Sequence, residues 1–305
     1  MVLAANAPDF DVVTWLASRP AWLHWHRNVT HALLFVPVMA ILSVVLVRWI
    51  GRKEVRWLPA FGIAAVGVLS HLALDMTNAY GVRLLLPFSP QWFSWDTTPV
   101  VDVALWAILL LGLAMPVLAG LVAGEIGEKR NPNRGTGAAI TALLLLTAYD
   151  AGRAFLHQRA MGLMAAQQVM PEQPRRIAAF PEANPLKWIG IAELSNSWAQ
   201  IPVDLRDGRL HANELQTIFK AEPVTAIEVA SRESAFQTLS EFAQYPLWTV
   251  EPAPDDPGAR QVTLLDLRFG EPVSPGFASA RAVVDALNRV KSTSFGVGPA
   301  NIRPR

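Results

Sequence analysis

The chain has 305 residues, of which 52% are hydrophobic and only 17% charged. Soluble domains carry about 25% charged residues, and the apolar residues here are concentrated in the first half of the chain. A net charge of +1 gives no electrostatic basis for binding nucleic acid. The absence of cysteine excludes disulfides, thiol nucleophiles and cysteine-ligated metals. These features predict a membrane protein without a nucleic-acid partner, and they leave the oligomeric state open.

Four apolar segments are each long enough to cross a bilayer, which takes about 20 residues. They cover residues 32–50, 58–76, 100–123 and 136–155. A soluble core rarely contains four such segments in succession. We therefore expect an all-α transmembrane domain of about four helices over residues 32–156, preceded by a short segment over residues 1–31.

Basic residues between the expected helices predict the orientation, because cytoplasmic loops are enriched in Lys and Arg. The first connection contains Arg48, Arg52, Lys53 and Arg56. The third contains Lys129, Arg130 and Arg134, whereas the second contains only Arg83. The N-terminal segment, the second connection and the C-terminal part are then expected on the outer, periplasmic side of the inner membrane. Four arginines after the last helix oppose this orientation, but long domains translocate largely regardless of charge.

The last third of the chain differs in pattern. Alternating and β-branched residues predict strands over residues 188–194, 198–205 and 261–269. Amphipathic periodicity predicts helices over residues 232–244 and 278–291, and the Pro-rich residues 251–258 predict a loop. We therefore expect a linker over residues 157–185, an extramembrane α+β domain over 186–292 and a flexible tail over 293–305.

Ionisable side chains gather at the outer ends of the expected helices. Two carboxylates lie in PDFD at 8–11, two histidines flank Arg27 in HWHRNVTH at 24–31, and SHLALD at 70–75 places His71 and Asp75 one helical turn apart. The candidate metal ligands are Asp9, Asp11, His26, His31, His71 and Asp75. His and carboxylate ligands without Cys suit zinc, and also manganese or iron(II). Ionisable groups within a span are functional by default.

The ordered motifs of this region resemble a known family. HRNVTHALLF is similar to the HRGxTHSLLF motif of the LexA-regulated, membrane-bound predicted metal-dependent hydrolases (the YdjM-like family). PDFD resembles that family's PDxD element, and residues 70–96 resemble its SHxxLDxxTxYGxxxLxPFS block and the following Asp. Asn28 and Ala32 stand where the family usually has Gly and Ser. The family's additional N-terminal helix with a D-x-x-T-H element has no counterpart before Pro8.

The resemblance implies a membrane-bound, metal-dependent hydrolase acting at the outer face. The six candidate ligands would bind one or two divalent ions that activate water. Asp102 or Asp96 would act as general base, and Arg27 would stabilise an anionic, membrane-associated substrate such as a phosphoester or lipid. Two alternative hypotheses account for the same cluster of ionisable residues. In one the protein is an ion-handling transporter, and in the other it is a non-catalytic membrane anchor whose C-terminal domain binds a partner.

Overall fold

The computed structural model describes residues 1–52, 54–125, 134–166 and 169–296. Within them, four helices are long and apolar enough to cross a membrane, as the sequence predicts. They are α3 (Val36–Gly51), α4 (Trp57–Thr77), α5 (Val103–Glu125) and α6 (Arg134–Ala166). Lys53, Lys129 and Arg130, which supported the predicted orientation, lie outside the described residues.

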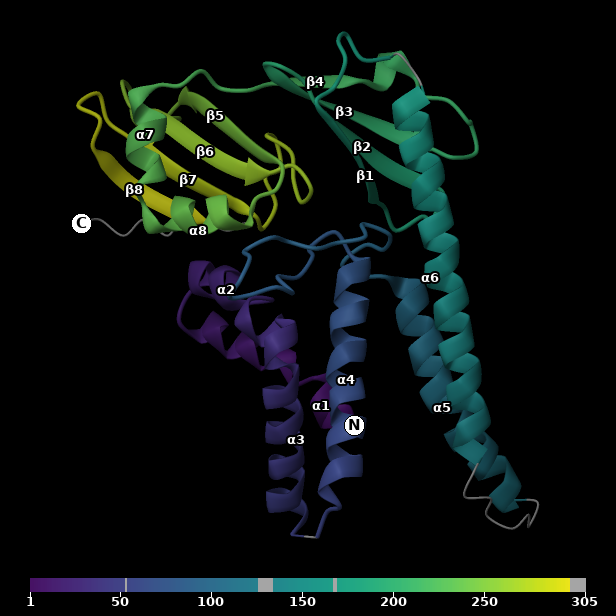
Figure 1. Cartoon of the computed structure of the whole chain (residues 1–305). Helices are drawn as coiled ribbons and strands as arrows, with labels where there is room; N and C mark the ends of the chain where they lie inside the picture. Colours follow the sequence, from purple (N-terminus) through teal and green to yellow (C-terminus); the bar gives the residue numbers. More distant parts are fainter. Residues whose placement is uncertain (53, 126–133, 167–168, 297–305) are drawn as a thin grey trace.

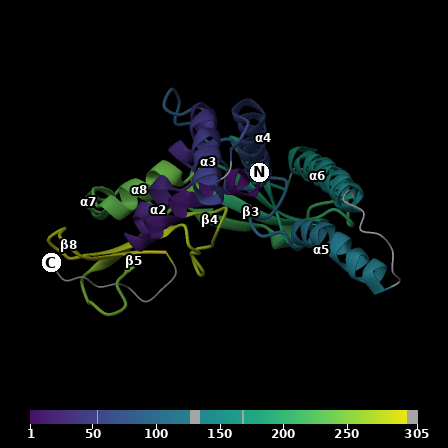
Figure 2. The same cartoon turned by 90° about the horizontal axis from the view of Figure 1, so that it is seen from below.

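The long helices form two antiparallel hairpins, α3–α4 and α5–α6, which stand apart as separate pairs (Figure 1 and Figure 2). In α5 and α6 the close approach depends on Gly112, because a Cβ added there would lie 2.7 Å from the Cβ of Ala142. Among the described residues, no residue in the most apolar 18-residue window of α5 is buried. Such a largely exposed apolar helix needs a hydrocarbon environment, which agrees with a membrane protein.

The N-terminal segment folds back against the first hairpin. It consists of the short helices α1 (Val2–Ala5), η1 (Pro8–Leu16), α2 (Arg19–Trp25), η2 (Val29–His31) and η3 (Leu33–Phe35). Helix α1 contacts both α3 and α4 (Figure 1). Gly67 of α4 permits this contact, since a Cβ there would lie 3.2 Å from the carbonyl oxygen of Met1. This packing brings the PDFD residues beside the upper end of α4.

The C-terminal part contains two antiparallel four-stranded sheets, each a simple meander. The first sheet comprises β1 (Arg176–Pro181), β2 (Lys187–Glu193), β3 (Ser197–Asp204) and β4 (Gln216–Phe219), with η4 (Ala212–Glu214) before its last strand. The second comprises β5 (Pro246–Pro252), β6 (Arg260–Asp266), β7 (Ser279–Val284) and β8 (Val290–Phe295). Helices α7 (Thr225–Ser231) and α8 (Ser234–Phe242) come between the two sheets in the chain. The expected α+β class is thus confirmed.

Two secondary-structure predictions for this part are wrong. Residues 278–291 form β7 and β8 instead of a helix: Ala280, Ala282 and Val284 are buried on one face of β7, with partly buried residues between them. Pairing with β6 and β8 on both sides selects this two-residue period. Residues 293–295, which were expected in a flexible tail, belong to β8, which ends at Phe295; residues 297–305 lie outside the described part.

The expected linker over residues 157–185 is also largely ordered structure. Helix α6 continues to Ala166, and β1 begins at Arg176. Ala160 and Met164 of α6 are buried in the core of the first sheet, together with Trp188 of β2. The last turns of α6 therefore pack one amphipathic face against the sheet. These turns are too polar to be predicted as part of a membrane span.

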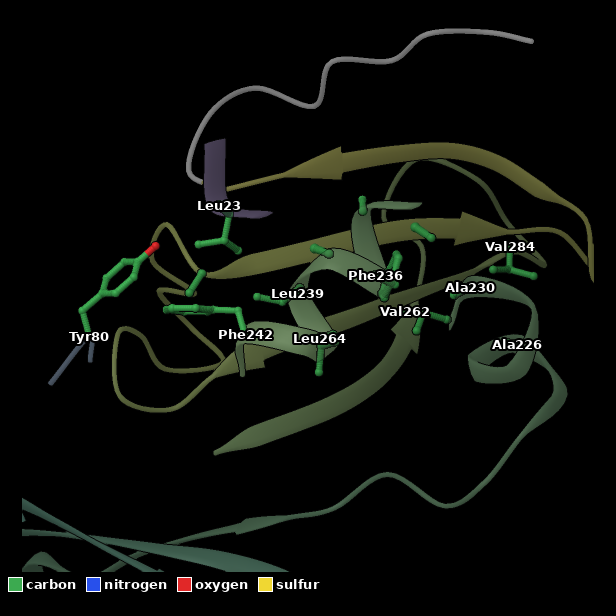
Figure 3. Close-up of a cluster of buried hydrophobic side chains, with 14 residues drawn as sticks. Leu23, Tyr80, Ala226, Ala230, Phe236, Leu239, Phe242, Val262, Leu264 and Val284 are labelled. Carbon is green, nitrogen blue, oxygen red and sulfur yellow. The ribbon is translucent and has the colours of Figure 1, made fainter. Parts of the chain in front are cut away.

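The second sheet shares its core with the N-terminal segment. Leu23 of α2 and Tyr80, in the loop after α4, lie in one buried cluster with Phe236, Leu239 and Phe242 of α8 (Figure 3). The ring of Tyr80 stacks on that of Phe277 at 6.2 Å. The loop after α4 contains Tyr80 and Gly81 of the motif block that resembles the known family. This loop is therefore packed against the C-terminal part.

Candidate metal centre

Three separate elements carry five of the six candidate ligands, and His26 directly follows α2 (Arg19–Trp25). Asp9 and Asp11 lie in η1, His31 ends η2, and His71 and Asp75 lie one turn apart on α4. Helix α2 leads to His26 and starts at an N-cap whose Ser18 hydroxyl accepts a hydrogen bond from the Ala21 N–H. The chain then turns sharply after α2, and Arg27 takes the left-handed conformation (φ 57).

A four-residue group has the geometry expected of metal ligands. It comprises Asp9, His31, His71 and Asp75, whose ligand atoms all lie within 4.8 Å of one another. The Nε2 atoms of His31 and His71 are 3.2 Å apart, and the Asp75 Oδ2 lies 3.2 Å from the first and 3.4 Å from the second. The Asp9 Oδ1 completes the group at 3.5 Å and 3.4 Å from the same nitrogens.

The bonding pattern of this group fits a divalent cation. The buried Oδ2 of Asp75 lies within 3.4 Å of the Nε2 atoms of both His31 and His71, but among the described residues it accepts no hydrogen bond of regular geometry. The His31 Nδ1 lies 3.0 Å from the Thr30 hydroxyl, which leaves Nε2 directed to the group. Two imidazole nitrogens and two carboxylate oxygens without sulfur are ligands that zinc, manganese or iron(II) accept. The residues can therefore hold such an ion.

A second group of possible ligands comprises Asp9, Asp11 and His26. Asp9 thus belongs to both groups and is suited to bridge two ions. Asp11 is already well bonded: its Oδ1 lies 2.8 Å from the His26 Nδ1, and its Oδ2 accepts from the Thr30 hydroxyl and the Arg27 N–H. A carboxylate that holds a histidine in this way orients it for a metal. The second group therefore offers fewer ligand atoms that are free of hydrogen bonds than the first group does.

The electrostatics of the four-residue group couple its members. Burial opposes a charge on His31, but hydrogen bonds with Asp75 and Asp9 outweigh it and raise the His31 pKa above its usual value. Burial also acts to raise the pKa of Asp9, whereas its hydrogen bonds with His31 and His71 hold that pKa well below the usual range. Because neutral imidazole is the metal ligand, a binding ion must displace protons from this group.

Arg27 supports the centre through its contact with Asp75. Its guanidinium pairs with the Asp75 Oδ1 at 2.7 Å, donates to the Asn78 Oδ1 at 2.9 Å and lies over the Tyr80 ring. The Asn78 Oδ1 also accepts a hydrogen bond from the backbone N–H of Tyr80. Asn78, Tyr80 and Thr30 are supporting residues that the sequence reasoning missed, although all three lie inside the motifs that carried the resemblance.

The two candidate general bases lie outside both ligand groups. Asp102 caps α5: its Oδ1 accepts the backbone N–H groups of Ala104 and Leu105, and its Oδ2 accepts the Tyr149 hydroxyl at 2.7 Å. Asp102 nevertheless lines a pocket together with Arg27 and Asp75. Asp96 does not line that pocket, and its electrostatic neighbours are Ser94, Arg268 and Asp266. The geometry thus disfavours Asp96 as a catalytic group.

Replacing Asp96 with asparagine is expected to stabilise the protein at neutral pH. Burial raises the pKa of Asp96 to about 6, so the folded state binds the proton more tightly than the unfolded chain does. The free energy of unfolding should therefore fall as the pH rises from about 4 to about 6, by on the order of 2 kcal/mol. Asparagine stays neutral and tolerates the left-handed backbone at this position (φ 53). Thermal unfolding in detergent at pH 4 and pH 7 measures this loss of stability, which should be smaller in the variant.

The other histidines lie apart from the centre. His24 is near Glu241, and His211 is near Asp207 at 3.2 Å. His157 is partly buried, and its ring lies 5.3 Å from that of Trp188 in a tilted arrangement. The C-terminal part therefore contributes no histidine to the described ligand groups.

Comparisons with known proteins identify the family of this chain. A model of the YdjM inner membrane protein family matches residues 1–160, which include every candidate ligand, helices α3, α4 and α5, and α6 as far as residue 160. An uncharacterized protein of Bacillus subtilis, YfhP, is 28% identical over 90 residues, which cover 29% of this chain and 27% of that protein. No solved structure matches the chain. Since the family model covers more than half of its residues, the chain belongs to the YdjM inner membrane protein family.

Proposed function

We propose that this protein is a membrane-bound, metal-dependent hydrolase acting on a membrane-associated phosphoester or lipid. The convergence of the ligand atoms of Asp9, His31, His71 and Asp75 within 4.8 Å of one another carries the proposal. A divalent ion held there would supply a Lewis acid and an activated water nucleophile.

The remaining polar residues have distinct tasks in this proposal. Asp11 fixes the ring of His26 through its Nδ1. Arg27 holds Asp75 in place and offers positive charge to an anionic substrate. Of the two candidate general bases, we retain Asp102, because it shares a pocket with Arg27 and Asp75. Its hydrogen bond from Tyr149 would orient the carboxylate for accepting a proton.

The proposal places the centre on the outer side of the inner membrane. The α3–α4 connection and the two sheets lie at opposite ends of the helices (Figure 1). Arg48, Arg52 and Arg56 lie in or beside that connection, and the positive-inside rule assigns it to the cytoplasm. The metal centre and the C-terminal sheets would then face the periplasm.

Metal analysis of the purified protein tests this function. We expect bound zinc, manganese or iron in the wild type, and a loss of at least about 100-fold in metal affinity in His71→Ala and Asp75→Ala. His211→Ala is the matched control, because that histidine lies outside both ligand groups. Hydrolysis of bis-p-nitrophenyl phosphate and of phosphatidic acid should fall in parallel. Equal metal content in all four proteins would contradict the proposal and favour the anchor alternative.

A further inference from the structure

A pocket with a volume of about 180 Å³ extends from the metal centre into the space between the two helical hairpins. We call it the interhairpin pocket. It is bounded by α4 on one side and by α5 and α6 on the other. Its lining residues are Arg27, Leu74, Asp75, Thr77, Asn78, Thr98, Pro99, Val100, Asp102, Leu105, Trp106, Leu109 and Leu146.

The two ends of the interhairpin pocket differ in chemistry. Arg27 and Asp75 connect one end with the ligand groups, and Thr98 and Asp102 add polar side chains there. Leu105 and Leu109 are one turn apart on α5, so they present a single apolar face. Leu146 of α6 extends that face. An occupant that matches both ends is amphiphilic.

An unpartnered donor marks the polar end. Arg27 is only 9% exposed, and its Nε has no hydrogen-bond partner among the described residues. A buried donor without a partner is costly, so its place next to a pocket points to an acceptor supplied by a ligand. A guanidinium beside a divalent-cation centre favours a phosphate group over a neutral headgroup.

The apolar end belongs to the membrane-facing surface. Trp106 and Leu109 remain 59% and 41% exposed, and no residue in the most apolar 18-residue window of α5 is buried among the described residues. A water-soluble substrate would gain little from walls of this kind. A hydrocarbon chain would contact them without leaving the apolar phase, because the pocket lies between helices that both face the bilayer.

We infer that the interhairpin pocket binds the first part of the hydrocarbon chain of a lipid phosphoester, with its phosphate directed to Arg27 and the metal centre. The substrate enters sideways from the bilayer between α4 and α5. This inference rests on the proposed function for the reaction, but the lipid-binding step is separate from it. It names the substrate class as chain-bearing phosphates of the membrane.

Binding of dioleoyl phosphatidic acid to the purified protein, followed by native mass spectrometry, tests the chain site. Leu109→Trp and Leu146→Trp fill the pocket from two different helices, and each should weaken binding at least tenfold. Leu110→Trp is the matched control, because Leu110 is 57% exposed on α5 and does not line the pocket. Unchanged affinity in both filling variants overturns the inference, and so does an equal loss in Leu110→Trp.

A second binding experiment tests the phosphate group by comparing the affinity for phosphatidic acid with that for dioleoylglycerol, which lacks the phosphate. Arg27→Gln should lower the affinity for phosphatidic acid and leave that for dioleoylglycerol unchanged. Wild-type protein that binds both lipids equally would overturn the assignment of a phosphate. Metal content, measured for every variant, reports whether the centre is still folded.

Activity separates this inference from the proposed function. In the filling variants, the rate for phosphatidic acid relative to that for bis-p-nitrophenyl phosphate should fall at least tenfold. If the wild type hydrolyses neither compound but binds lipid in the predicted pattern, the proposed function fails and the lipid site stands. If all variants hydrolyse both compounds equally, the lipid site is wrong and the hydrolase stands.

Discussion

Replacing Asp9 with alanine is expected to lower the metal content of the purified protein to background. Asp9 is the one residue shared by both possible ligand groups, so its loss removes a carboxylate from each. The Asp9 Oδ1 lies within 3.5 Å of the Nε2 atoms of His31 and His71. Elemental analysis of protein dialysed against trace zinc measures the effect, which should be at least about 100-fold in affinity.

The His26→Ala variant tests whether the centre binds one metal ion or two. His26 belongs only to the second group, with Asp9 and Asp11. If two ions bind, this variant should lose one of them and keep the other in the four-residue group. If His26 only packs on Asp11 and Trp22, the metal content should stay at the wild-type value. Wild-type metal content in Asp9→Ala would contradict the assignment of both groups.

Arg268→Ala should separate the C-terminal part from the loop that supports the metal centre. Arg268 pairs with Asp266 at 2.7 Å, with both side chains almost fully buried. It also donates to the carbonyl oxygens of Ala79 and Phe242. Removing it leaves a buried carboxylate without its cation, which costs about 3–5 kcal/mol. We expect thermal unfolding several degrees lower and weaker metal binding, because Tyr80 and Asn78 lose their support.

The chain contains a matched control for this variant. An Asp-Leu-Arg sequence also ends β3, where Arg206 pairs with Asp204. Arg206 is 59% exposed, so its ion pair is screened by solvent and contributes little. Arg206→Ala should leave both unfolding temperature and metal affinity near wild type. Equal destabilisation by the two variants would show that the contact of Arg268 with Ala79 does not cause the lower unfolding temperature.

The sequence predicted the elements of the centre because their signals are local. Four apolar segments specify long membrane helices whatever surrounds them, and the structure confirms these helices with shifts of a few residues at most ends. The one-turn spacing of His71 and Asp75 on α4 follows directly from helical geometry. The ordered motifs likewise indicated the family before any contact was known.

Helical periodicity misled the sequence reasoning where neighbouring strands decide the structure. Residues 279–284 contain apolar residues at spacings compatible with a helix, but β7 pairs on both edges and adopts a period of two. The same limit applies to Asp96 and Asp102. Both are acidic residues near one helix start, and only the contacts of Asp102 with Tyr149 and of Asp96 near Arg268 distinguish them.

The sequence by itself thus determined the membrane helices, the ligand types and the family, since each depends on residue identity and short-range spacing. The tertiary structure alone decided which atoms converge: Asp9 and His71 are far apart in the chain and meet because α1 packs against Gly67 of α4. It also decided that Tyr80 belongs to the core of the second sheet. Such contacts depend on long-range packing, which no local pattern encodes.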